Sequence, residues 1–524
     1  MSNEGPQQGD PIGPLMFSNT VQPLLASLAA ELTLGYLDDL TLGGHQDEVA
    51  KDVERIISEG RNMGLLLNIS KCELITDPGT TLNDPVLQSF KRLTVQDSSL
   101  LGAPLFPGSI LDSNWTDRCN DLSRAVDRLS LISSQDALIL LRASFSAPRV
   151  QHLLRGSPSA DNAALDMFDN LLHTALNRLT NSNLSDMQWL QASLPIKEGG
   201  LGVRRVSSLA ISAFCSSAAS TSSLQSAILS SHPCPSDFFL DTYQARWSKV
   251  HGTIPTGDQS HKQSTWDRPG ILKDRASVEL SLVDSRQKAT FLAASAHHSG
   301  DWLMALPIAS CGLRLDDEAV RVAVASRLGL DLCVPHPCSC GAPVDAWGIH
   351  AFVCKHASGK VLRHQALNDV ISRAFASAGV PAMKEPSGLS RSDGRRPDGL
   401  SLIPWQNGKP VTWDVTVATT LSNSYISASA GSGGAAAELA ASKKISKYAD
   451  LPASYIFQPI ALETLGTMNG SAAEFFTDLG RRISNVSGEE REGLFLFQRL
   501  SVTLQRYNAI LLHNSFVTGG DPDQ

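Results

Sequence analysis

Apolar residues run up to two adjacent acids near the start of the chain and resume directly after them. Leu34-Gly35-Tyr36-Leu37 precedes Asp38-Asp39, and Leu40-Thr41-Leu42 follows. This pattern predicts a β-hairpin with the acids at its tip. Because adjacent carboxylates repel each other, the tip is either a solvated Asp-Asp turn or a site for a divalent cation.

Helical periodicity marks most of the chain that follows. Residues 45–70 predict a helix closed by Gly64, and residues 114–155 predict two further helices. Residues 160–330 are rich in Ala, Ser and Leu, which predicts helices with no evident chemistry. A polar stretch at 232–270 with Pro and Gly interrupts them and predicts a long loop or a linker.

A second region of strands is predicted in the last third of the chain. It follows a helix whose apolar face includes Leu362 and Phe375 and which stops at Gly379. Alternation over 411–417 then predicts a strand with Asp414 opposite its apolar face. A carboxylate in so apolar a strand is costly unless it is paired or bound to metal.

Two more elements are predicted near the end of the chain. Residues 453–462 read as a strand, and Ser487-Gly488-Glu489-Glu490 predicts a capping box that opens a helix through Leu512.

Composition fits a globular intracellular protein, although its charge is unusual for one that binds nucleic acid. The 524 residues leave room for two to four domains, and no apolar run is long enough to span a bilayer. The nine cysteines form no disulfide framework, which favours a reducing compartment. Net charge of −8 disfavours phosphate binding unless the basic residues cluster.

Four soft ligands predict a zinc site. Cys338-Ser339-Cys340 is followed by His350 and Cys354, a set that can surround one tetrahedral zinc ion. The alternative is a group of buried cysteines beside a hydrogen-bonded histidine. Three neighbours leave the choice of ligands open: Cys333, His336 and His356.

Four blocks of the first 105 residues, in this order, resemble the reverse transcriptases of non-LTR retrotransposons: 7–15, 36–39, 64–73 and 101–105. The resemblance implies that Gln8 and Gly9 position template and nucleotide. It also implies that Tyr36, Asp38 and Asp39 form the metal-binding palm turn and that Lys71 approaches the triphosphate. The family takes a third aspartate from further upstream, and this chain begins at Met1. We therefore expect an incomplete RNA-directed DNA polymerase that is inactive alone.

Asp398 and Asp414 resemble the PD-(D/E)xK core of the restriction-like endonuclease of the same elements, which the Cys-Cys-His-Cys knuckle precedes. The usual lysine position holds Thr416. The resemblance implies a lysine from the next helix instead, where we prefer Lys444 and place Lys447 second. The lysine ammonium then orients the attacking water or stabilises the phosphate, and Mg²⁺ is the expected metal ion of the site. Glu385 is the candidate third acid.

Basic side chains near these acids are candidate nucleic-acid contacts, although each also fits an ordinary surface or structural role. They are Arg363, His364, Arg395 and Arg396.

The turn between the two aspartates sets a geometric condition. Asn407-Gly408 predicts a two-residue hairpin turn, and a regular hairpin about it pairs Asp398 with Val417. The two aspartates then point to opposite faces. They can share a cation only if the loop has an odd length or a bulge, for which Pro404 is a plausible position.

Together these features predict a multidomain α+β and α/β protein from a non-LTR retrotransposon. The expected parts are a partial reverse transcriptase palm (1–110), thumb-like helices (111–190), an α-helical connector (191–330), a zinc knuckle (331–360) and a restriction-like endonuclease (361–515). The expected function is Mg²⁺-dependent nicking of target DNA, with DNA and RNA as partners in the nucleus. The alternative is a non-catalytic nucleic-acid-binding remnant.

Overall fold

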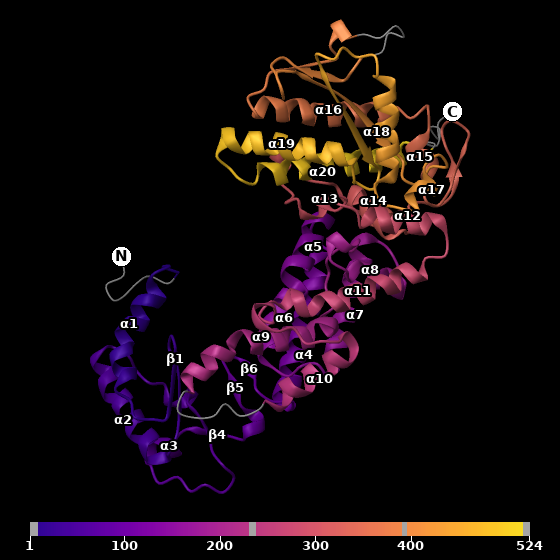
Figure 1. The fold of residues 1–524 in the computed structure, drawn as a ribbon. Helices are drawn as coiled ribbons and strands as arrows, with labels where there is room; N and C mark the ends of the chain where they lie inside the picture. Colours follow the sequence, from indigo (N-terminus) through magenta and orange to yellow (C-terminus); the bar gives the residue numbers. More distant parts are fainter. Residues whose placement is uncertain (1–8, 230–236, 390–395, 517–524) are drawn as a thin grey trace, which may run out of the picture. The chain divides into compact units, whose positions relative to one another are not determined.

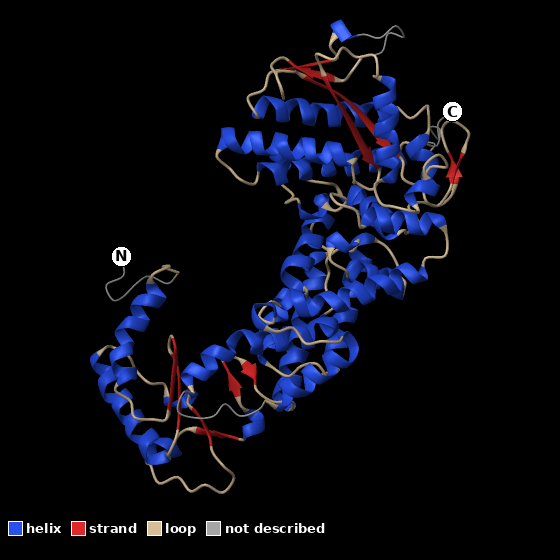
Figure 2. Cartoon of the chain, viewed as in Figure 1, coloured by secondary structure: helices blue, strands red, loops and turns tan. Residues whose placement is uncertain are grey.

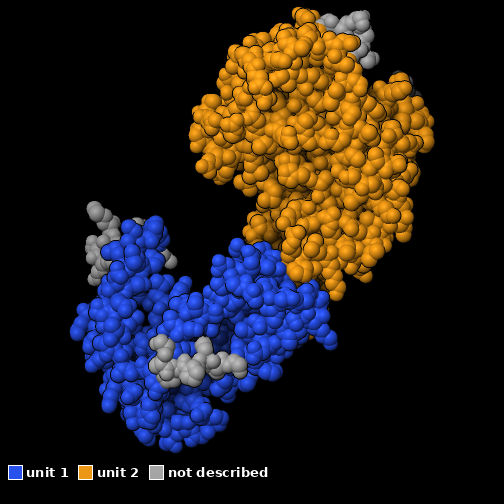
Figure 3. Space-filling model, in the orientation of Figure 1, with its two compact units in different colours: residues 1–117, 151–162, 210–266 blue, residues 118–150, 163–209, 267–524 orange. Residues whose placement is uncertain are grey.

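The computed structural model describes residues 9–229, 237–389 and 396–516, and it mixes helices with small sheets (Figure 1, Figure 2). It divides into two compact units (Figure 3). Unit 1 comprises residues 1–117, 151–162 and 210–266, and unit 2 comprises 118–150, 163–209 and 267–524. The predicted mixture of helix and sheet in a multidomain chain is confirmed. Every helix in the described ranges is too short or too polar to span a bilayer.

The predicted hairpin of unit 1 is confirmed, with the acids at its tip. Strands β1 (Leu32–Tyr36) and β2 (Asp39–Gly43) pair antiparallel, and Tyr36 lies opposite Asp39. Leu37 adopts a positive φ of 54°, as the first residue of so tight a turn requires.

Helix α2 (Gln46–Asn62) follows the hairpin and is shorter than predicted. Gly64, with a φ of 77°, ends it in the left-handed region. The other elements of this region are α1 (Gly13–Ala26), β3 (Glu73–Ile75), α3 (Pro85–Gln88), β4 (Lys91–Leu93), β5 (Ser99–Leu100) and β6 (Ala103–Pro104).

The middle of the chain is helical, as predicted, but it is divided differently. Three α-helices replace the two predicted after residue 114, because Ser133 caps a new helix by accepting the Asp136 backbone N–H at 3.3 Å. They are α4 (Ser109–Leu129), α5 (Ser134–Leu140) and α6 (Ala147–Gly156). Further helices up to residue 328 include α7 (Ala164–Thr180), α8 (Asp186–Ser193), α9 (Val206–Ile228), α12 (Ser285–Ala294), α13 (Asp301–Met304) and α14 (Asp317–Leu328).

The loop predicted at 232–270 is wrong for most of its length. Residues 237–270 include helix α10 (Phe238–His251) and the start of α11 (Gln263–Ser281). The Asp237 side chain caps α10, and Pro269 lies inside α11. Buried Trp247 and Trp266 pack with ring centroids 5.1 Å apart, and this burial outweighs the polar composition that suggested a loop.

A four-stranded sheet organises the last third of unit 2. Its order is β12-β11-β10-β9, from β9 (Ala382–Lys384), β10 (Gly399–Ser401), β11 (Val411–Ala418) and β12 (Ile456–Glu463). The pair β11–β12 is parallel, joined through helix α18 (Ala435–Lys447), and the other pairs are antiparallel. Helices α16 (Gly359–Ser377), α19 (Gly470–Ser487) and α20 (Glu492–His513) complete this part.

The two faces of β11 pack against different partners, as its alternation predicts. Trp413 and Val415 join the main core with α16 and α19, where Phe375 stacks on Trp413 at 4.6 Å. Ala418 on the opposite face packs with the alanines of α18. Asp414 lies on this second face, so α18 covers it.

Two details of the predicted helices need correction. Leu362 is 48% exposed, and Leu367 is buried in its place. The capping box at 487–490 does not form, because Ser487 ends α19 and Gly488 turns left-handed with a φ of 77°. Helix α20 begins only at Glu492.

Candidate functional site

The register between β10 and β11 brings the two predicted aspartates to neighbouring positions. Gly399 on β10 pairs with Trp413 on β11. Asp398, one residue before Gly399, therefore lies opposite Asp414, one residue after Trp413. The hairpin tip is regular, with Gln406 opposite Lys409, but residues 402–404 leave the ladder. Three extra residues on one strand change the parity of the register. The condition set by the sequence is therefore met, and Pro404 lies in the extruded segment.

Asp414 is almost completely buried and is surrounded by donors from α18 and from the residue that follows it. Its side chain is 4% exposed. Lys444 donates to Oδ1, Tyr448 donates to Oδ2 at 2.5 Å, and Lys447 Nζ lies 3.6 Å from Oδ2. The predicted acid and both predicted lysines thus lie together.

Asp398 directly precedes β10 and contacts α16. Its Oδ2 accepts the backbone N–H of Val415 at 2.6 Å and lies 2.9 Å from His364 Nε2. This hydrogen bond outweighs burial and raises the pKa of the His364 imidazole above its usual range. His364, which the sequence suggested only as a nucleic-acid contact, therefore contacts a candidate catalytic acid.

Glu385 occupies the next position across the sheet. Lys384 pairs with Gly399, so Glu385, Asp398 and Asp414 continue one row across β9, β10 and β11. The Glu385 side chain is 60% exposed and forms an ion pair with Arg396. The structure therefore brings Glu385 beside the site without directing its carboxylate inward.

Two residues that sequence reasoning did not assign to the site connect its parts. The amide of Asn368 donates to the Asp398 carbonyl at 3.1 Å and accepts from the Trp413 indole at 2.9 Å. Tyr448 binds Asp414 directly. Tyr448 lies four residues after Lys444, a spacing that places two side chains on one helix face, so the sequence carried a signal for it.

The candidate nucleic-acid contacts fall into different environments. Arg363 is buried at 2% exposure and donates to Asn508 at 2.8 Å, and burial lowers its pKa to about 10. This placement corrects the expectation that it contacts phosphate, because its guanidinium faces the protein interior. Arg396 is exposed, as is Gly9. Gln8 and Arg395 lie outside the described residues.

The two acids of the unit 1 hairpin remain at the surface. Asp38 and Asp39 are exposed, as are Tyr36 and Lys71. Among the described residues, neither acid joins a group of three metal-binding side chains. The tip thus offers two carboxylates on a tight turn.

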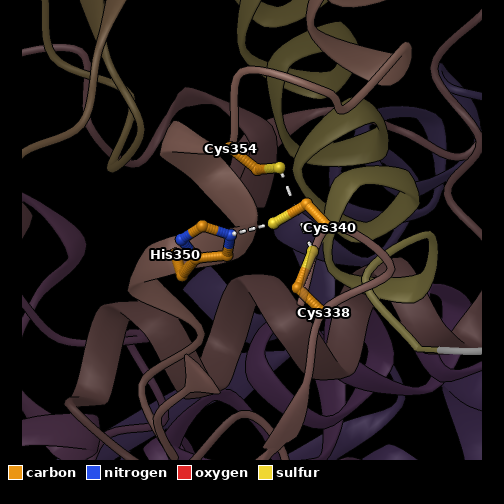
Figure 4. A group of neighbouring side chains, drawn as sticks. All are labelled: Cys338, Cys340, His350 and Cys354. Atoms are coloured by element: carbon orange, nitrogen blue, oxygen red, sulfur yellow. Dashed lines mark hydrogen bonds between the residues drawn. The ribbon is translucent and has the colours of Figure 1, made fainter. Parts of the chain in front are cut away.

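The four predicted zinc ligands do converge (Figure 4). Their ligand atoms all lie within 4.8 Å of one another. Cys340 Sγ is 3.2 Å from His350 Nε2, and Cys338 Sγ is 3.9 Å from Cys354 Sγ. Around a tetrahedral zinc ion these separations are about 3.5–3.8 Å, so three thiolates and one imidazole fit this metal.

Short elements hold the zinc ligands in place. Cys338 and Cys340 lie in the turn between β7 (His336–Pro337) and β8 (Pro343–Val344), where Gly341 has a φ of 86°. His350 lies on α15 (Ile349–Val353), and Cys354 follows it one turn later.

The structure also separates these four ligands from two of their neighbours. His336 bonds Val334 and Ser515 and stacks on Phe516, and Cys333 Sγ faces the Asp345 carbonyl. Neither side chain belongs to the cluster of ligand atoms.

The carboxylate site has the ligand chemistry for a hard divalent cation. Mg²⁺ prefers carboxylate oxygens, and each carboxylate has about four acceptor positions. Asp398 and Asp414 therefore keep acceptor capacity beside their hydrogen bonds. Because donors already engage both oxygens of Asp414, a cation competes with Lys444 and Tyr448 for this side chain.

Comparison with known proteins points to a mobile element. No family model matches the chain. The retrotransposable element SLACS 132 kDa protein of Trypanosoma brucei gambiense is 23% identical over 407 residues, which cover 76% of this chain and 30% of that protein. The chain thus spans less than a third of its relative. The similarity supports a retroelement-derived protein.

Proposed function

We propose that this chain is a non-LTR retrotransposon protein in which unit 2 is a metal-dependent DNA endonuclease that nicks target DNA. The observation that carries the proposal is the convergence of Asp398, Asp414 and Lys444 from three separate elements. Buried carboxylates beside ammonium groups at one end of a sheet are the side chains that phosphodiester hydrolysis needs.

Each side chain has a role in this reaction. Asp398 and Asp414 would hold the cation, which would polarise the phosphate and lower the pKa of the attacking water. Lys444 stabilises the charge that develops on the phosphate, and Lys447 assists it. His364, half-exposed beside Asp398, orients a phosphate oxygen. Arg396 contacts the backbone of the DNA strand.

The remaining parts fit the same proposal. The zinc knuckle supports binding of DNA and of the element's RNA, and the exposed acids of the unit 1 hairpin belong to a partial polymerase palm. Nicking of chromosomal targets implies action in the nucleus.

A second candidate function is that of a non-catalytic nucleic-acid-binding protein derived from a retroelement. The observation that favours it is the engagement of Asp414, whose oxygens accept from Lys444 and Tyr448. In this alternative the ion pair is structural and does not open to a metal.

A plasmid assay distinguishes the two functions. Supercoiled DNA is incubated with the zinc-loaded full chain and Mg²⁺, and nicked circles are quantified. We expect Lys444→Ala to lower the nicking rate by about 10²–10³-fold and Asp414→Ala to abolish nicking. Lys443→Ala is the matched control, because the neighbouring ammonium contacts Tyr425 at 3.2 Å instead. Equal nicking by all variants rules out this site, and DNA binding without nicking favours the second function.

A further inference from the structure

The hydroxyl of Tyr448 joins three segments that meet at the carboxylate site. It lies 2.5 Å from Asp414 Oδ2 on β11 and 2.9 Å from the carbonyl oxygen of Arg396. The ammonium of Lys447 donates to the Tyr448 hydroxyl oxygen at 3.0 Å. Tyr448 itself directly follows α18, so one atom connects helix, strand and the segment leading into β10.

A proton count shows that these contacts cannot all be satisfied at once. A tyrosine hydroxyl donates one proton, while the Asp414 carboxylate and the Arg396 carbonyl are both acceptors. The carboxylate is the stronger acceptor because it is ionised. The hydroxyl therefore donates to Asp414 in this arrangement, and the Arg396 carbonyl is its alternative acceptor.

The alternative acceptor matters because of its position in the chain. Arg396 precedes Asp398 by two residues, and Pro397 between them restricts the backbone. A bond from Tyr448 to the Arg396 carbonyl thus fixes the segment that carries Asp398. The same hydroxyl controls Asp414 directly and Asp398 through its backbone.

We propose that Tyr448 is a positioning residue for the cation site, a proposal that rests on the proposed function. Its hydroxyl holds Asp414 until a cation binds, and then turns its proton to the Arg396 carbonyl. Both acceptors lie within hydrogen-bond reach, so this change needs only rotation of the O–H bond. Tyr448 thereby releases an oxygen of Asp414 and, through its new bond to the Arg396 carbonyl, holds the Asp398 segment in place.

The ring of Tyr448 allows this role to be tested without disturbing the core. The side chain is 3% exposed, and its ring packs against Phe457 with centroids 4.7 Å apart. Tyr448→Phe keeps this packing and removes only the oxygen. Tyr455→Phe is the matched control, since among the described residues the Tyr455 hydroxyl has no hydrogen bond to the site.

The first experiment measures cation affinity directly. Mn²⁺ is titrated calorimetrically into the zinc-loaded full chain, its variants and Asp414→Asn. We expect Tyr448→Phe to tighten Mn²⁺ binding about fivefold, because it removes a bond to the charged Asp414 from the cation-free chain and only a weaker bond to a neutral carbonyl from the cation-bound chain. We expect Tyr455→Phe to match the parent chain. Unchanged or weaker affinity in folded Tyr448→Phe overturns the positioning role. If Asp414→Asn binds as well as the parent, the cation lies elsewhere and the proposed function fails too.

A second measurement covers the case in which Tyr448→Phe does not fold. The six tyrosines of the parent chain are replaced biosynthetically by 3-fluorotyrosine, and the Tyr448 fluorine signal is assigned by elimination with Phe variants of the other five. We expect Mg²⁺ to move this signal with the midpoint found by calorimetry, and to leave it unmoved in Asp414→Asn. A Tyr448 signal that Mg²⁺ does not move in the parent chain overturns the proposal.

Discussion

Lys444 forms an ion pair with Asp414, although 30 positions separate the two residues in the chain. The parallel crossover from β11 through α18 to β12 brings them together, because the helix returns over the strand face that carries Asp414. Lys447 lies 3.6 Å from the other oxygen, so two ammonium groups face one buried carboxylate.

The first prediction concerns stability without added divalent cations. Lys444→Met should lower the free energy of unfolding of the zinc-loaded chain by about 2 kcal/mol, since the buried Asp414 keeps only the more distant Lys447 as a charged partner. Lys443→Met should cost less than about 1 kcal/mol, because that ammonium lies over the Tyr425 ring near the surface. Urea denaturation measures both values, and equal losses contradict the assigned pairing.

The second prediction concerns the metal of the knuckle. Elemental analysis of the purified chain should give about one zinc ion per chain, and Cys354→Ser should lose it because a four-ligand structural site tolerates no gap. Cys333→Ser should keep the zinc, since its thiol faces the Asp345 carbonyl. Loss of zinc from both variants, or from neither, would show that the ligand set is wrong.

The third prediction concerns Glu463, a fully buried acid at the end of β12. Its carboxylate accepts the Ala437 backbone N–H at 3.1 Å and the Thr420 hydroxyl at 2.9 Å, and so caps the first turn of α18. Burial raises the pKa of this carboxyl above its ordinary value of 4.5.

The sign of the effect follows from proton linkage. The folded chain binds the Glu463 proton more tightly than the unfolded chain, so this stabilisation is full below pH 4.5 and is lost as pH rises through the raised pKa. Glu463→Gln cannot ionise and should gain stability relative to the parent as pH rises over this window. Unfolding at several pH values tests this, and a difference that does not change with pH refutes it.

Local patterns predicted much of the carboxylate site. The alternation of Val411, Trp413 and Val415 placed Asp414 on the opposite face, and the helical spacing of Lys444 and Lys447 placed both on one side of α18. Both features depend on near neighbours in the chain, so periodicity is enough to find them.

Contacts between distant segments decided what local patterns could not. Arg363 is buried because Asn508, 145 positions away, accepts its hydrogen bond. The register of β10 depends on the Trp413 ring, which crosses Gly399 so closely that a Cβ there would lie 2.0 Å from it. It depends also on Leu402, whose N–H donates to the Pro381 carbonyl at 2.8 Å. No short window of sequence contains these pairs.

The extruded segment 402–404 gives the last prediction. Its three residues set the parity that brings Asp398 to the position beside Asp414, so we expect removal of one of them to make β10 slip by one residue against β11. A slip by one residue turns Asp398 to the opposite face, and the two acids then cannot hold one cation. Deletion of Ile403, which is 42% exposed, should therefore abolish both Mn²⁺ binding and nicking. Ile403→Ala keeps the residue count and should preserve both. If the deletion variant folds and still binds Mn²⁺ with parental affinity, the register does not create the site, and the pairing of the two aspartates loses its physical basis.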